Sequence, residues 1–258
     1  MIGGVNVATS QIANIYNQGN NQLSDTLAKI ASGKKFQNAG EDLLSFTRAN
    51  NLSNQIKGYN DVEQKLTDAK TVTSAAVNVG SKVYENLTKM SDLAGKYAAA
   101  SATEQAEYTA EFNSLKDTVV KSLENAKVDG VSITSGTYTR TVNMDPNGST
   151  MSIALDTVVD SAAVDALAIG TAGADLTTQT GNALTFMADA KGFNDMIDNQ
   201  ISLNKTIVNS KEAVKSLITD IDEASEMSKM LDQNVRQQAA MSMLSQANMS
   251  RQVVMKLY

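Results

Sequence analysis

Apolar side chains recur every three or four residues over most of the chain, which is the pattern of helices that bury one face. The first such segment covers residues 5–32 and ends at Ser32–Gly33. The pattern resumes near Glu41 and continues to Tyr97. From Leu52 onward its apolar positions are separated only by threes and fours: Leu52, Ile56, Tyr59, Val62, Leu66, Ala69, Val72, Ala76, Val79, Val83, Leu87, Met90, Ala94 and Tyr97. This spacing predicts a coiled-coil seam on a helix roughly 85 Å long. We therefore expect an elongated protein, because a compact chain of this length has a radius of gyration of only about 18 Å.

The rest of the chain predicts more helix around a small β segment. "SATEQAEYTAEF" opens a third helix with Thr103 as its N-cap, and "VDGVSI" ends it in a turn. Residues 131–156 contain two short β-rich stretches joined by the turn sequence "DPNGS". Residues 157–190 are rich in Ala, Thr and Gly and favour no single element. Helical periodicity returns near Phe193 and continues into the final residues, "QAAMSMLSQANMSRQVVMKLY".

The two ends of the chain carry matching apolar stripes, which favours folding back at the β segment. We expect a mainly α fold, a long antiparallel helical bundle or coiled coil formed by the N- and C-terminal helices, with a small β-hairpin insert. Residues 1–40 and 222–258 are predicted to form a terminal coiled-coil domain. Residues 41–221 are predicted to form an elongated helical rod that includes the β segment at about 131–156. Two or three helices leave apolar surface uncovered, and this favours self-association.

Composition and charge narrow the possible functions. The chain has 258 residues and a net charge of −6, so an electrostatic surface for nucleic acid is not expected. No apolar run approaches the ~20 residues that span a bilayer, so membrane insertion is not expected. Histidine and cysteine are both absent, which removes the commonest general base and metal ligand and any disulfide. "MIGGVNVATSQ" does not read as a secretory signal, because the first basic residue is Lys29.

Candidate chemistry along the chain is weak, and we predict no catalytic, cofactor or metal site. "SGKKFQNAGEDLLS" lacks the phosphate-loop pattern and favours a connection between helices. "DIDEASE" places its carboxylates on more than one helix face, which favours a solvated or interface face over a cation site. Six methionines near the end could form an adaptable groove, although packing along a helix seam is favoured. They are Met227, Met230, Met241, Met243, Met249 and Met255.

Two stretches resemble the signatures of bacterial flagellin. "LSDTLAKIASGKKFQNAGEDLLSFTRANNLSNQIKG" (Leu23–Gly58) is similar to the N-terminal signature, and "DEASEMSKMLDQNVRQQAAMSMLSQANMSRQVVMKLY" (Asp222–Tyr258) to the C-terminal one. "NGSTMSIAL" also resembles the central hairpin of the family. The chain departs from the family where L-R-I-N is replaced by "KKFQ", where D-D-A-[AS]-G is replaced by "EDLLS", and at Arg251 in place of a proline.

The resemblance implies a structural subunit that polymerises into a helical flagellar filament for motility. It implies a short family member without large outer domains, secreted through the flagellar export apparatus with an export chaperone and located outside the cell. Further implied partners are other copies of the chain, the hook–filament junction and cap proteins, and a host Toll-like receptor. A hook–filament junction protein is the alternative within this class, and a cytoplasmic coiled-coil adaptor is a third interpretation. A metallopeptidase insert, as some flagellins carry, would need H-E-x-x-H, and the chain has no His.

The resemblance also assigns candidate site residues. The terminal helices of this family pair as an inner coiled coil and pack on the same helices of neighbouring subunits. The predicted self-assembly interface consists of Ile12, Ile15, Leu23, Leu27, Ile30, Met241, Leu244, Val254 and Leu257. Lys89, in "ENLTKMSDL", aligns with an Arg that some flagellins present to the innate receptor.

Overall fold

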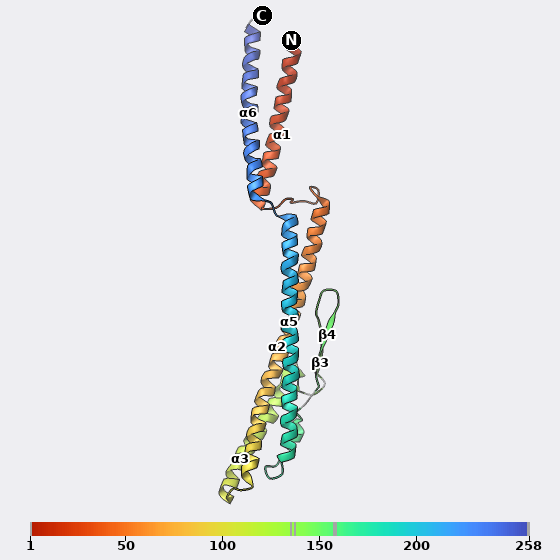
Figure 1. Cartoon of the computed structure of the whole chain (residues 1–258), viewed down its shortest axis with the longest axis vertical. Helices are drawn as coiled ribbons and strands as arrows, with labels where there is room; N and C mark the ends of the chain where they lie inside the picture. Colours follow the sequence, from red (N-terminus) through yellow and green to blue (C-terminus); the bar gives the residue numbers. More distant parts are fainter. Residues whose placement is uncertain (1, 135, 137, 157–158, 257–258) are drawn as a thin grey trace. The chain divides into compact units, whose positions relative to one another are not determined.

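The chain is mainly helical, as predicted. This computed structural model describes residues 2–134, 136, 138–156 and 159–256; for residues 2–9, 250–251 and 254–256 the description is limited to the backbone. The elements are α1 (Ile2–Ser32), α2 (Leu43–Tyr97), α3 (Ala102–Asn125), β1 (Lys127–Val128), β2 (Val131–Ser132), β3 (Tyr138–Asn143), β4 (Thr150–Leu155), α4 (Ser161–Asp165), α5 (Gly173–Thr219) and α6 (Glu223–Lys256). Figure 1 labels the five long helices and the strands β3 and β4.

The elements divide into two compact units. The first unit combines Met1–Asn54 with Ser210–Tyr258, and the second is Gln55–Asn209. The first therefore contains α1, α6 and the outer ends of α2 and α5, while the second contains the remaining elements. The domain boundaries expected from the sequence, near residues 41 and 221, stay a prediction.

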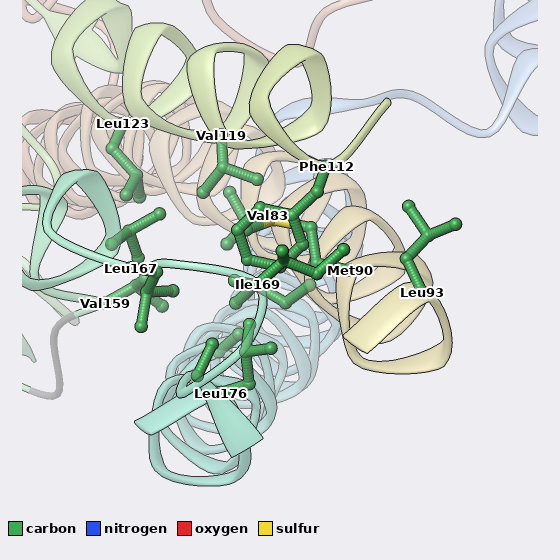
Figure 2. Close-up of a cluster of buried hydrophobic side chains, with 14 residues drawn as sticks. Val83, Met90, Leu93, Phe112, Val119, Leu123, Val159, Leu167, Ile169 and Leu176 are labelled. Atoms are coloured by element: carbon green, nitrogen blue, oxygen red, sulfur yellow. The ribbon is translucent and has the colours of Figure 1, made fainter. Parts of the chain in front are cut away.

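The second unit has a continuous apolar interior in three clusters of buried side chains. In the largest cluster, Phe112, Val119 and Leu123 of α3 are spaced by seven and four residues, so they share one helix face. Figure 2 shows Phe112 close to Val83 and Met90 of α2, both of which are fully buried. The three-and-four spacing of α2 thus marks a true core face.

The hairpin of the second unit is stabilised by the pairing of β3 with β4 and by hydrogen bonds to α5. β3 and β4 pair antiparallel, from Tyr138 opposite Leu155 to Asn143 opposite Thr150. The carbonyl of Met144, just after β3, accepts hydrogen bonds from Gln200 and Asn204 of α5, each at 3.0 Å. These bonds fix the tip of the hairpin on the helix.

Pro146, in the turn between β3 and β4, lies against Gly58 of α2. A Cβ atom on Gly58 would stand only 3.1 Å from the Cβ of Pro146. Glycine therefore allows the turn to approach the helix closely. This gives a packing reason for the glycine in "IKG".

Three sequence-based expectations differ from the structure. The N-cap of α3 is Ser101 and not Thr103, because the Glu104 carboxylate accepts from the Ser101 backbone N–H at 2.8 Å. α5 begins at Gly173, twenty residues before Phe193, because small and apolar residues of "GADLTTQTGNALTFMADA" bury one face there. The C-terminal helical pattern is also interrupted, since α5 ends at Thr219 and α6 begins at Glu223.

We predict that Phe112→Ala lowers the free energy of unfolding of the second unit by about 3–5 kcal/mol, because a fully buried ring leaves a cavity. Chemical denaturation of the monomer measures the loss. Leu184→Ala is the control, since Leu184 is 48% exposed, and it should change the stability by less than about 1 kcal/mol. Equal effects of the two substitutions would contradict the core assignment.

Candidate functional site

The terminal helices α1 and α6 pack along each other within the first unit and run antiparallel, as Figure 1 shows. On α1, Ile12, Leu23 and Ile30 are half-buried, and on α6 Leu244 is half-buried. The three residues of α1 are separated by eleven and seven residues, so they share one helix face, which contacts α6.

The other predicted interface residues are not covered within one chain or are not described. Ile15 is 59% exposed, Leu27 is 48% exposed and Met241 is 54% exposed. The side chain of Val254 and the whole of Leu257 lie outside the described residues. The predicted set is therefore divided between the contact of α1 with α6 and the surface of the pair.

No large apolar side chain of the first unit is fully covered among the residues whose side chains are described. Its buried apolar residues are Ala49 and Ala240. By contrast, thirteen of the seventeen large apolar side chains that the structure describes as exposed belong to this unit. They are Ile15, Leu27, Leu43, Leu44, Val214, Leu217, Met227, Leu231, Val235, Met241, Met243, Met249 and Val253.

The seam between α1 and α6 is narrow and partly polar. Gly19 of α1 lies opposite Gln237, whose Cγ would be 3.6 Å from a Cβ built on the glycine. A cavity of about 200 Å³ lies here, and its lining includes Gln22, Gln233 and Ala240. The Oε1 atom of Gln233 and the Nε2 atom of Gln237 are buried and have no hydrogen-bond partner within the described part of the chain. Small and amide side chains thus occupy much of a seam that the sequence suggested would be apolar.

A second apolar stripe runs along α6 on a face turned away from this seam. Leu231 and Met249 are 18 residues apart, which is five helical turns, so they lie on the same face. Gln237 of the seam is rotated by about 120° from Leu231. We call this second face the outward stripe; its members are between 45% and 63% exposed. They are Met227, Leu231, Val235, Met249 and Val253.

The outward stripe differs from the sequence-based expectation, which placed the apolar residues of α6 on one face. The sequence does contain a signal for this second face. Apolar residues are spaced by four from Met227 to Val235, and Met249 and Val253 repeat this spacing 18 residues after Leu231 and Val235. The interpretation of the methionines as seam packing fits Met230, which is half-buried. It does not fit Met227, Met241, Met243 and Met249, which are 45–60% exposed in the single chain.

The segments that leave α1 and enter α6 are joined by a short β-bridge. Lys34 and Asp220 are the bridged residues, and Lys35 donates its backbone N–H to the carbonyl of Thr219 at 2.7 Å. We call these four residues the connector clasp. Because it uses backbone hydrogen bonds, the clasp sets the relative position of α1 and α6 at this end of the pair.

The carboxylate of Asp220 is the polar centre of the connector clasp. It accepts hydrogen bonds from the Lys34 ammonium and from the hydroxyls of Ser216 and Thr219. These bonds, with the one from Lys34 the strongest, hold the pKa of Asp220 well below its ordinary value. The carboxylate therefore stays ionised throughout the neutral and mildly acidic range.

Both ends of the chain match the sequence models of one family. Residues 5–139 match the bacterial flagellin N-terminal helical region, and residues 193–258 match the bacterial flagellin C-terminal helical region. The chain belongs to the bacterial flagellin family. Flagellins are the structural subunits of the flagellar filament, and this is the function of the chain.

Similar proteins agree with this assignment over nearly the whole length. The chain is 25% identical to flagellin FljO of Caulobacter vibrioides, covering 94% of this chain and 93% of that protein. It is 24% identical to the flagellin of Bacillus subtilis, covering 98% of each. A solved flagellar hook-associated protein from Vibrio parahaemolyticus has a TM-score of 0.58 and 17% identity, and it covers 69% of this chain and 99% of its own. At this identity the last similarity shows the fold alone.

The remaining predicted site residue, Lys89, lies on α2 in the second unit. Its side chain is exposed, while Leu87 and Met90 on either side of it are fully buried. Among the described helices, none is both long and apolar enough to cross a membrane.

We predict that Asp220→Asn loosens the connector clasp without unfolding α1 or α6. The pKa of Asp220 is lowered in the folded chain relative to the ~3.9 of an unfolded aspartate, so its contribution is present above about pH 4 and lost at lower pH. The side chains of Lys34 and Asp220 are 49% and 40% exposed, so solvent screening limits the contribution to about 1 kcal/mol or less. Hydrogen exchange at the backbone N–H of Lys35 should therefore accelerate by up to about fivefold at pH 7.

Asp232→Asn is the matched control, since it removes a carboxylate from an exposed pair with Arg236. It should leave the exchange of Lys35 unchanged. Unchanged exchange in Asp220→Asn as well would show that the carboxylate does not hold the clasp.

Proposed function

We propose that α1 and α6 join neighbouring subunits of the filament, and that Ile15, Leu27, Met241 and the outward stripe of this pair are the contact surface. One observation supports the proposal above the others: among its described side chains the first unit exposes thirteen large apolar ones, nine of them on α1 and α6, and has no large one fully covered. Large exposed apolar surfaces mark association sites. A filament subunit has copies of itself as neighbours, so a second copy is the expected occupant.

Two faces of the pair have different roles in this proposal. The half-buried Ile12, Leu23, Ile30 and Leu244 hold α1 against α6 within one subunit. The exposed Ile15, Leu27 and Met241 and the outward stripe contact neighbouring subunits. Val254 of α6 and Leu257, which lies outside the described residues, belong to the proposed interface by their position in the sequence.

A protein of the hook–filament junction is the second candidate. The observation in its favour is the fold similarity to the hook-associated protein. The matches to both flagellin regions favour the filament subunit. Contact with junction and cap proteins at the ends of a filament is part of our proposal.

We further propose secretion by the flagellar export apparatus, with an export chaperone, to an extracellular filament. The absence of cysteine from the chain supports this route, because no disulfide can lock the chain before it passes through a narrow channel. We expect no enzymatic activity, which agrees with the structural role of the family. That expectation, like the chaperone, stays a prediction.

We predict that Leu231→Asp abolishes filament growth while the monomer stays folded. Leu231 is 58% exposed in the single chain, so the charge is hydrated there, but a neighbouring subunit would remove that water. The critical concentration for seeded polymerisation should rise at least about a hundredfold, since burying an unpaired charge costs several kcal/mol. Met243→Asp is the matched control, because Met243 is 60% exposed but about 120° away from Leu231 and about 80° from the nearest members of the outward stripe, Val235 and Val253. Normal growth of Leu231→Asp from filament seeds would remove the outward stripe from the interface.

We predict that deletion of residues 239–258 abolishes filaments and leaves the thermal unfolding of the second unit almost unchanged. None of the three core clusters contains a residue from this segment. Calorimetry of the deleted monomer measures the transition, and seeding with filament fragments measures growth. Leu244→Asp should behave in nearly the same way, since it places a charge in the seam of the terminal pair. Filaments growing from the deleted subunits would show that this end of α6 is dispensable.

We propose, from the family resemblance, that the exposed Lys89 is a contact for a host Toll-like receptor. Lysine keeps the charge of an arginine but lacks its planar, bidentate guanidinium. Lys89→Arg should therefore increase receptor signalling in a reporter-cell assay. Lys82→Arg, on an exposed lysine of the same helix, is the control that should leave signalling unchanged. Equal signalling by the parent chain and Lys89→Arg would remove Lys89 from the receptor site.

A further inference from the structure

Exposed methionines are concentrated on α6. Five methionines with described side chains are at least 45% exposed, and four of these lie on this one helix. The five are Met196, Met227, Met241, Met243 and Met249. Met90 and Met151 of the second unit, in contrast, are 0% and 6% exposed. Thioether sulfur on α6 is thus open to dissolved oxidants in a free subunit.

Three of these methionines coincide with the proposed contact surface. Met227 and Met249 belong to the outward stripe, and Met241 lies at its edge, rotated by about 40° from Met227. Met243 is about 160° away from Met241 and about 80° from the nearest members of the outward stripe, Val235 and Val253, so it serves as an internal comparison. Met196 provides a second comparison, since it is 50% exposed and lies on α5 in the other unit.

We propose that Met227, Met241 and Met249 form an oxidation site that controls polymerisation. This inference rests on the proposed role of α6 in assembly. In the forward step the sulfur of methionine attacks one oxygen of a peroxide; an S–O bond forms, the O–O bond breaks, and the peroxide is reduced by two electrons to water. In the reverse step a dithiol reductase removes the oxygen as water and is itself oxidised to a disulfide.

The sulfoxide affects the free subunit and the assembled subunit differently. In the free subunit the three side chains are 45%, 54% and 52% exposed, so a new S=O group is hydrated and the helix stays intact. None of the three belongs to a core cluster. When a neighbouring subunit covers the face, the S=O group loses water and meets apolar side chains. An unpaired polar group in that position opposes association.

The test uses the full-length chain, partly oxidised as a monomer with hydrogen peroxide. The sample is seeded with filament fragments, and the polymerised and unpolymerised fractions are separated. Peptide mass spectrometry then gives the sulfoxide fraction at each methionine. Sulfoxide at Met227, Met241 and Met249 should be enriched at least about tenfold in the unpolymerised fraction, which is the discrimination expected for burying one unpaired polar group. Sulfoxide at Met243 and Met196 should divide evenly, and treatment with a methionine sulfoxide reductase should restore growth.

A matched pair of variants tests the same inference independently. Met227→Leu combined with Met241→Leu and Met249→Leu should polymerise normally after peroxide treatment. Met196→Leu combined with Met243→Leu should lose growth as the parent chain does. Met255→Leu is included in every protein, because the side chain of Met255 lies outside the described residues.

The outcomes separate this inference from the proposed assembly role. Even division of sulfoxide at Met227, Met241 and Met249 would overturn the inference, and so would loss of growth in the peroxide-treated triple variant. Neither result depends on the growth of Leu231→Asp, which tests the assembly role by itself. If Leu231→Asp fails to grow while oxidised monomers join filaments freely, the outward stripe is an interface that tolerates sulfoxide.

Discussion

The covering of apolar side chains within one chain is the constraint on which this structure depends. Isolated helices gain little from backbone hydrogen bonds alone and need an apolar face buried by tertiary contacts. In the second unit α2, α3, α5 and the hairpin supply those contacts, and residues such as Leu66, Phe112 and Ile153 are fully covered. The first unit contains mainly two helices, and two helices cover only one side of each other. The remaining apolar surface of the first unit can be covered only by another molecule.

This difference links folding to assembly. A unit whose interior is complete can be stable as a monomer, whereas the α1–α6 pair, in the proposed assembly, gains much of its stabilisation when neighbouring subunits cover it. The narrow seam at Gly19 and Ala240 brings the two helices close without burying a large side chain. The pair is therefore suited to be a component of a larger helical layer. In the proposed assembly, the same apolar residues that are exposed in one subunit take the place of the missing core.

The sequence was informative where one apolar pattern corresponded to one buried face. The seam of α2 was predicted correctly because residues from Val62 to Leu87 follow threes and fours and face a single interior. The pattern was harder to interpret in α6, where seam residues such as Leu244 and outward residues such as Leu231 produce two overlapping stripes. It failed in the first part of α5, where small residues such as Ala183 and Ala190 pack closely but carry little hydrophobic signal. The break at Asp220 depends on a contact with Lys34, 186 residues away along the chain, which local spacing does not reveal.

The connector clasp gives this incomplete unit a fixed starting geometry. The backbone hydrogen bonds and the ion pair of Lys34 with Asp220 form within a single subunit, so they do not require contact with neighbouring subunits. Their free energy is small because the groups are partly exposed, yet they determine where α6 begins relative to the end of α1. Within the described part of the chain, the buried amide atoms of Gln233 and Gln237 have no hydrogen-bond partner, so they add a cost to the seam of the single subunit. A subunit whose two helices are already aligned loses less conformational freedom on joining a filament, and this preorganisation strengthens association without any additional contact.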